Sequence, residues 1–127
     1  MGYGKASDWW SFGALIYEML CGIPPFYSEN KETNYRNIKF AVPKLDYPFL
    51  SEAARDILTK LLTKDPYKRL GNIEGGVDAI KDHPWFDEVE WDTVYNKMIP
   101  PPYKPVLDNG TDTRHFPKEF TNMKMSL

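Results

Sequence analysis

The chain has 127 residues, of which 42% are hydrophobic and 27% charged, so it is long and apolar enough for one folded domain. Its net charge is −2 and no basic block occurs, which disfavours nucleic acid and anionic membranes as main partners. A single cysteine rules out an internal disulfide framework and indicates a reducing compartment. With no signal peptide and no apolar stretch long enough to span a bilayer, we expect an intracellular, cytoplasmic protein.

The first predicted helix is the apolar run Trp9–Cys21. Only three residues interrupt this run, and one of them is an acid, Glu18. A helix that is apolar on nearly every face is typical of the interior of a larger body. Ser7 or Asp8 can cap its start, and Gly22 can end it.

A polar helix is predicted next, over residues 31–40. We expect three of its side chains to anchor it to the rest of the fold: Tyr35, Ile38 and Phe40. The clearest amphipathic helix follows Ser51, a strong N-cap residue, and stops near Lys64. Its apolar stripe consists of Ala54, Ile57, Leu58, Leu61 and Leu62. We assign this stripe to the core, together with Trp9, Trp10, Phe12 and Leu15.

The last third of the chain is predicted to be mostly irregular. Short helices are expected over residues 77–81 and after Asp92, which can cap the sequence TVYNKM. From Pro100 on, closely spaced prolines disfavour both helix and sheet and favour an extended tail. No strand signal is strong anywhere, so the predicted fold class is mainly α.

Neither a metal site nor a nucleophilic centre is indicated by the residues alone. His83 and His115 are far apart in the sequence, and no pair of metal ligands has the spacing that zinc sites use. The turn-rich sequence GNIEGG lacks the Lys-Ser/Thr of a phosphate-binding loop. Composition and spacing therefore indicate a helical globular piece without a catalytic constellation.

Four motifs in order give the chain a family resemblance. They are GYGKASDWWSFGALIYEMLCGIPPF, LLTKDPYKRLG, HPWF and PPPYKPVLDNGTDTRHFPKEFT. Together they resemble the C-terminal part of AGC-group serine/threonine protein kinases, the branch that holds protein kinases A, B and C. The resemblance runs from Gly2 to about Thr121. It implies a partial kinase fold, with the helical C-terminal part of the large lobe over residues 1–99 and a segment of the C-terminal tail over residues 100–127.

The resemblance implies a role for each of the two acids of the first helix. Asp8 matches the acid of the D-x-W-x-x-G pattern, which supports the catalytic loop by accepting hydrogen bonds from its backbone N–H groups. A plain N-cap is the simpler alternative, and the two roles are compatible. Glu18 matches the acid that, in basophilic members of the family, receives an arginine of the peptide substrate. A cationic partner is physically reasonable, because an acid in an apolar helix is costly unless it is paired. A salt bridge inside the lobe is the alternative for Glu18.

Two further residues are given roles by the resemblance. Arg69 matches the arginine that anchors the activation segment by pairing with the last glutamate of that segment. The alternative is that Arg69 is an ordinary surface arginine. That glutamate is absent from this sequence, so we expect water or a substitute at the guanidinium. Phe116 and Phe120 match the F-x-x-x-F element of the tail, whose first aromatic contacts the adenine of ATP. The family often has an acid after this phenylalanine, where this chain has Pro117. A disordered tail is the alternative reading of this segment.

The sequence lacks the motifs that carry kinase chemistry. There is no Gly-rich loop, β3 lysine, H-R-D loop or D-F-G motif. We therefore expect no catalytic residue and no metal site in this chain, with ATP and Mg²⁺ bound by the parent kinase only. The parent's predicted substrates are proteins with basic residues near the target Ser or Thr. The chain alone is expected to be inactive and to self-associate where the remainder of the kinase packs. A degenerate kinase lobe or non-catalytic interaction module is the alternative.

Overall fold

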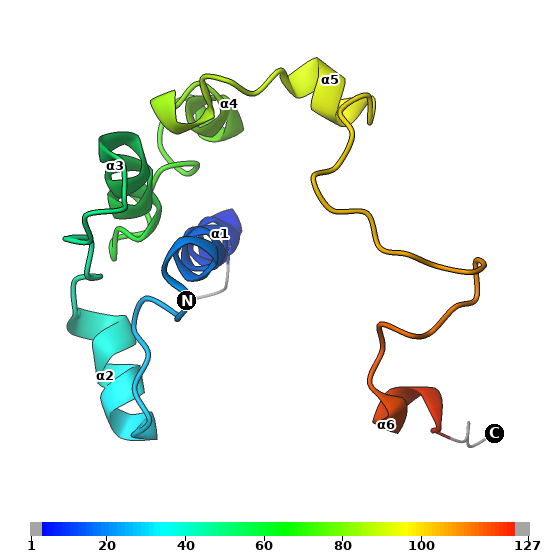
Figure 1. Ribbon diagram of the computed structural model, residues 1–127. Helices are drawn as coiled ribbons and strands as arrows, with labels where there is room; N and C mark the ends of the chain where they lie inside the picture. Colours follow the sequence, from blue (N-terminus) through cyan, green and yellow to red (C-terminus); the bar gives the residue numbers. More distant parts are fainter. Residues whose placement is uncertain (1–3, 124–127) are drawn as a thin grey trace. The chain divides into compact units, whose positions relative to one another are not determined.

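The computed structural model describes residues 4–123, which form two compact units, one up to Trp91 and the other from Asp92 on. Figure 1 shows the helices α1 Lys5–Cys21, α2 Lys31–Phe40, α3 Glu52–Leu61, α4 Gly76–Lys81, the 3₁₀ helix η1 Pro84–Phe86, α5 Trp91–Tyr95 and α6 Lys118–Thr121. Because residues 4–123 contain helices and no strand, the predicted mainly α fold class is confirmed. Within that range no helix combines the length and apolarity that a membrane crossing requires.

Helix α1 begins four residues earlier than the apolar run suggests. Its N-cap is Gly4, which provides no side-chain cap, so the prediction that Ser7 or Asp8 caps the helix is wrong. Both residues lie in the first turn, where the Ser7 N–H donates to the Gly4 carbonyl at 2.9 Å. The hydrophobic pattern marks where apolar residues start and does not mark where the hydrogen bonds of the helix start. The predicted end is confirmed, because Gly22 adopts a φ of 79° and its N–H bonds to Glu18 O.

The core of the first unit is built around the contact between α1 and α3. Its buried members are Ile16, Tyr17, Phe26, Ile57, Leu58, Leu61, Leu62, Leu70 and Ile80. The two helices approach each other closely at Gly13, where a Cβ atom would lie 2.7 Å from Leu61 Cβ. Only glycine leaves room for this approach, so Gly13 lets α3 insert its stripe against α1.

The core assignments made from the sequence are confirmed with one exception. The stripe of α3 is buried, and Trp9, Trp10 and Phe12 pack against the buried cluster while staying partly exposed. Leu15 is 54% exposed, so its assignment to the core is wrong. It lies on the exposed side of α1 in the first unit.

Helices α2 and α3 begin where the sequence predicts. The Asn30 side chain caps α2 by accepting from Thr33 N at 2.9 Å, and the predicted Ser51 cap of α3 accepts from Ala54 N at 3.1 Å. Of the three expected anchors of α2, Tyr35 and Phe40 are 56% and 77% exposed, so the prediction is wrong for these two, whereas Ile38 is 40% exposed and lines cavities together with Trp10. Helix α2 is held by its C-terminal end instead, where Lys64 Nζ donates to the carbonyls of Asn37 and Ile38 at 3.3 and 2.7 Å.

The later elements match the predicted order, and some of their ends differ. Helix α4 covers the predicted 77–81 segment and η1 contains Pro84, Trp85 and Phe86 of the HPWF motif. Helix α5 starts at Trp91, so Asp92 lies in its first turn and does not cap it as predicted. Residues 100–117 form neither helix nor strand, which confirms the irregular tail, and the short α6 follows.

Candidate functional site

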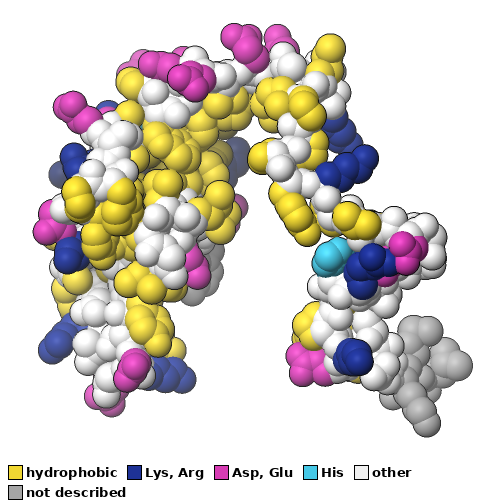
Figure 2. Space-filling model, viewed as in Figure 1, with side chains coloured by type: hydrophobic (Ala, Val, Ile, Leu, Met, Phe, Trp, Pro, Cys, Tyr) yellow, Lys and Arg dark blue, Asp and Glu magenta, His cyan; other side chains and the backbone are white. Residues whose placement is uncertain are grey.

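The two acids singled out from the sequence lie on the solvent-exposed side of α1. We define the open face of α1 as five of its exposed residues, Asp8, Ser11, Leu15, Glu18 and Met19; Lys5 and Leu20, near the two ends of the helix, are also exposed. Successive residues turn by about 100°, so the two acids, ten positions apart, point about 80° from one another around the helix. Leu15 and Met19, which are 54% and 76% exposed, lie between and beside them. Figure 2 shows hydrophobic side chains (yellow) over much of the surface of the first unit. The open face therefore combines two carboxylates with exposed apolar area.

The environments of Asp8 and Glu18 differ in one respect. Asp8 lies in the first turn of α1, where the positive end of the helix dipole favours a carboxylate. Glu18 is exposed, and no residue within 4–123 forms an ion pair or side-chain hydrogen bond with it. The apolar sequence around Glu18 suggested that its carboxylate is buried at a cost in free energy. Because Glu18 is exposed in the described part of the chain, that cost does not arise there. The alternative of a salt bridge inside the lobe is not formed by these residues.

Arg69 is buried, with 6% of its surface exposed, and it ties three segments together. Its Nε donates to Thr63 O at 2.9 Å, its Nη1 to Ala6 O at 2.5 Å and its Nη2 to Lys64 O at 3.1 Å. The bond to Ala6 joins residues 63 positions apart and fixes the start of α1 to the loop after α3. Three backbone carbonyls therefore take the place of a carboxylate at this guanidinium, and two of its five N–H donors make no bond within residues 4–123.

Trp10 forms an aromatic platform beside Arg69. Its ring stacks on that of Phe26 at a centroid distance of 5.4 Å. The Arg69 guanidinium lies 4.9 Å from the Trp10 ring, and Lys64 Nζ lies 4.8 Å from the same ring and 3.8 Å from Phe26. Two cations therefore share one aromatic surface, where the ring faces partly compensate for lost hydration.

The electrostatics of this platform favour an anion. Burial lowers the pKa of the Arg69 guanidinium against a smaller raising effect of the nearby Asp65 carboxylate. Burial together with the charge of Arg69 lowers the pKa of the Lys64 ammonium. The two cations line a cavity of about 240 Å³ with Trp10, Ile38 and Lys39, and none of the five residues carries a carboxylate. A carboxylate entering this cavity would meet the positive side chains of Lys39, Lys64 and Arg69. The sequence indicated Arg69, whereas the contribution of Lys64 and Trp10 becomes visible only in three dimensions.

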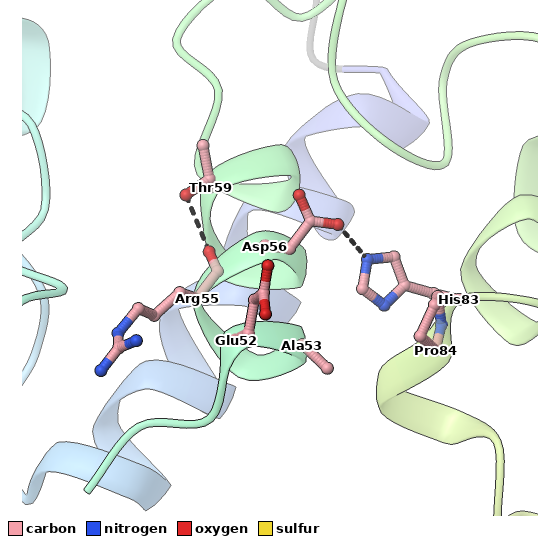
Figure 3. Close-up of a pocket in the computed structure, with 7 residues that line it drawn as sticks. All are labelled: Glu52, Ala53, Arg55, Asp56, Thr59, His83 and Pro84. Carbon is pink, nitrogen blue, oxygen red and sulfur yellow. Dashed lines mark hydrogen bonds and ion pairs between the residues drawn. The ribbon is translucent and has the colours of Figure 1, made fainter. Parts of the chain in front are cut away.

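A second concave surface lies between α3 and η1 and contains none of the residues predicted to be functional. Its volume is about 610 Å³, and its lining includes Glu52, Asp56 and His83, shown in Figure 3. His83 Nδ1 accepts from Trp85 N at 3.1 Å, so the proton of the neutral ring is on Nε2, which lies 2.8 Å from Asp56 Oδ2. Lys60 bonds to the same oxygen at 2.6 Å, and these two donors lower the pKa of Asp56. Since every polar group of the buried imidazole is satisfied, its role is to fix η1 on α3.

The tail unit presents the predicted aromatic pair to solvent. Phe116 and Phe120 are 63% and 61% exposed, and Phe120 belongs to α6. Phe116 lines a concavity of about 340 Å³ together with Arg114 and Lys118. Across residues 4–123, no three His, Cys, Asp or Glu side chains are grouped closely enough to hold a metal ion.

Comparison with known proteins places these features in a family. The protein kinase domain matches residues 1–86, which is about two thirds of the chain. The chain belongs to the protein kinase family. The match covers α1, α2, α3 and α4, so the open face of α1 and the Arg69 cavity both lie inside the kinase domain. The tail unit lies beyond it.

Three named kinases are similar to this kinase chain over most of its length. The serine/threonine-protein kinase gad8 of Schizosaccharomyces pombe is 46% identical over 122 residues, which is 95% of the chain and 21% of that protein. The RAC family serine/threonine-protein kinase homolog of Dictyostelium discoideum is 44% identical over 127 residues, 99% of the chain and 27% of its own length. The cAMP-dependent protein kinase type 3 of Saccharomyces cerevisiae is 47% identical over 115 residues, 90% of the chain and 29% of its own length. The kinase chain thus spans less than a third of each relative.

Proposed function

We propose that this chain is part of an AGC-group serine/threonine protein kinase. Residues 1–99 are the C-terminal part of its large lobe, and residues 100–127 belong to its C-terminal tail. The parent protein transfers the γ-phosphoryl group of ATP to Ser or Thr hydroxyls in arginine-containing protein substrates. The observation that carries this proposal is the 44–47% identity to three named kinases over 90–99% of the chain, kinase-domain and tail units together.

ATP and Mg²⁺ belong to the remainder of the parent protein in this proposal. When bound, they supply the phosphoryl group and neutralise its charge. Among residues 4–123 no three His, Cys, Asp or Glu side chains are grouped, and we assign none of them to the metal ion. The contribution of this chain is to support the catalytic loop, receive the peptide and hold the activation segment.

The open face of α1 serves two of these tasks. Asp8 holds the catalytic loop by accepting hydrogen bonds from its backbone N–H groups, and its place in the first turn of α1 puts the negative charge at the positive end of the helix dipole. Glu18 receives the substrate arginine. Its exposure and lack of a cationic partner within residues 4–123 leave the carboxylate available for an incoming guanidinium. The apolar area of Leu15, between the two acids, and of Met19, beside Asp8, is where the rest of the lobe packs.

The Arg69 cavity anchors the activation segment. Its two unused N–H donors, the nearby Lys64 ammonium and the Trp10 platform are complementary to a carboxylate carried by an apolar segment. The three carbonyls already bound to Arg69 hold the guanidinium in place before that carboxylate arrives. Arg69 thereby joins the activation segment to the start of α1.

Phe116 supplies the contact of the tail to the nucleotide. Its ring is exposed and can therefore lie against the adenine. Pro117, which follows, starts the turn into α6 with a φ of −56° and removes one backbone donor. We expect this to alter the path of the tail relative to kinases that carry an acid at this position.

The chain by itself is expected to transfer no phosphate. Purified chain incubated with radiolabelled ATP, Mg²⁺ and an arginine-containing peptide should give the signal of a mock purification, because none of the phosphate-binding motifs is present. If a longer transcript encodes these motifs in frame before codon 1, the protein expressed from it should phosphorylate the peptide in the same assay. Labelling by the chain alone, above the mock purification, would contradict the prediction. A transcript without the motifs would favour the alternative of a non-catalytic module.

The chain is also expected to self-associate through the open face of α1. Exposed Leu15 and Met19 form an apolar surface that is complementary to a second copy when the rest of the lobe is missing. The double variant Leu15→Lys/Met19→Lys should shift the mass measured by light scattering toward the monomer. Val42→Lys, at an exposed valine outside α1, is the control and should leave the mass unchanged. If the 127-residue chain without substitutions were monomeric at high concentration, the predicted association would be ruled out.

A further inference from the structure

The part of the tail just before Phe116 contains a closed loop, Asp108–Arg114, held by a single carboxylate. Asp112 Oδ2 accepts from Asp108 N at 2.9 Å and from Arg114 Nε at 2.7 Å, while its Oδ1 accepts from Arg114 N at 3.0 Å. The guanidinium of Arg114 also pairs with the carboxylate of Asp108. Both ends of the loop are therefore bonded to the same side chain.

The Asp112 carboxylate is more buried than most of its surroundings, and its hydrogen bonds favour the ionised form. The Asp112 side chain is 11% exposed, although most residues around it in the tail unit are exposed. The two backbone N–H bonds, followed by the bond from Arg114, hold its pKa below the usual range of aspartate. Asn109 Oδ1 accepts from Thr111 N at 2.9 Å, so the tip of the loop is fixed as well. Few residues of the tail have this number of bonds.

The loop leads directly into the backbone of Phe116. Thr113 lies inside it, and the Thr113 carbonyl accepts from Phe116 N at 2.9 Å. The turn that places Phe116 thus starts from a residue that the loop already fixes. The side chains of Arg114 and Phe116 then line the same concavity.

We propose that Asp112 is a positioning residue that closes the Asp108–Arg114 loop and thereby sets the backbone at Phe116. Its functional meaning rests on the proposed contact of Phe116 with the nucleotide. The negative charge of the Asp112 carboxylate suits it to this task, because hydrogen bonds to an ionised acceptor are stronger than those to a neutral one. An ordered entry to Phe116 lowers the entropy lost when its ring docks on a ligand.

Proton binding should open the loop in a defined direction. Because the folded-state pKa of Asp112 is depressed, the loop is fully stabilised above the ordinary aspartate pKa of about 3.9 and loses this stabilisation as the pH falls through the lower folded-state value. The other titratable groups near Asp112 are Asp108, Arg114 and His115.

Amide hydrogen exchange on the 127-residue chain tests the loop itself. Asp112→Ala and Asp112→Asn should speed exchange at the amides of Asp108 and Arg114 by about tenfold, as expected for the loss of a charge-assisted hydrogen bond. Asp108→Asn is the matched control, because it weakens the Arg114 side-chain contact and keeps both backbone bonds of Asp112. Unchanged exchange in the Asp112 variants, or equal acceleration in the control, would overturn the proposal.

Kinetics of the full-length kinase test the consequence for Phe116. Asp112→Ala should raise KM for ATP about threefold or more at unchanged kcat, since it removes preorganisation and no catalytic group. Phe116→Ala should raise the same KM. If Phe116→Ala raises it and Asp112→Ala does not, the positioning role of Asp112 is wrong. If neither does, the nucleotide contact is wrong, and the exchange data still decide whether Asp112 closes the loop.

Discussion

Replacement of Arg69 by methionine is expected to lower the free energy of unfolding of this chain by about 3–5 kcal/mol. Methionine keeps much of the packing against Trp10 and removes all donors to the carbonyls of Ala6, Thr63 and Lys64. Each buried acceptor that loses its partner costs about 1–3 kcal/mol. We expect the bond to Ala6 to contribute most to this loss of stability, because it joins residues 63 positions apart and fixes the start of α1 against the loop after α3.

Urea unfolding followed by circular dichroism measures this loss. Arg69→Lys should give an intermediate value, since an ammonium can reach some of the carbonyls and keeps the charge near Trp10. Arg36→Met, at an exposed arginine of α2, is the control and should change the stability by less than about 0.5 kcal/mol. If Arg69→Met were as mild as this control, Arg69 would not be the link between the two segments.

Replacement of Glu18 by glutamine should reduce kcat/KM of the full-length kinase for an arginine-containing peptide by about 30-fold or more. The substitution preserves shape and removes the negative charge, so a bound guanidinium loses its ionic partner. A loss of about 2 kcal/mol is typical when one member of a charged hydrogen-bonded pair is removed, and this gives the stated factor. The same enzyme should act on a peptide with alanine at the arginine position with nearly unchanged kcat/KM.

The ratio between the two peptides is the decisive measurement. Glu29→Gln, another exposed acid of the same domain, is the control and should leave the ratio unchanged. Equal losses for both peptides would mean that Glu18 supports the lobe and does not select the substrate. An unchanged arginine preference would mean that another acid receives the substrate arginine.

Where the residue pattern was strong, the sequence predicted the fold well. The helix after Ser51 is recognisable because a capping side chain precedes an apolar stripe of helical period, and both features are local. The exposure of α2 and of Leu15 was predicted wrongly, because apolar character indicates burial only when a partner surface is present. Helix α2 is instead fixed by Lys64 from 26 positions further along the chain, a contact without any local signature.

The candidate site divides in the same way. Motif positions in the sequence were enough to name Asp8, Glu18, Arg69 and Phe116, because each is identified by its own residue type and its immediate neighbours. The three carbonyls around Arg69, the Trp10 platform and the cavity with Lys64 were not, since these groups come from four separate segments. The same holds for the pairing of His83 with Asp56.

The sequence by itself determined the helical fold class, the order of the helices, the irregular tail and membership of the kinase family. These follow from periodicity, capping residues, prolines and motif order, which act over a few neighbouring residues. Only the tertiary structure decided where α1 begins, which of its sides is exposed and what surrounds Arg69. These depend on packing and hydrogen bonds between residues far apart in the chain, such as the bond from Arg69 to Ala6. A pattern of neighbouring residues cannot predict such a contact, because its two partners meet only when the chain folds.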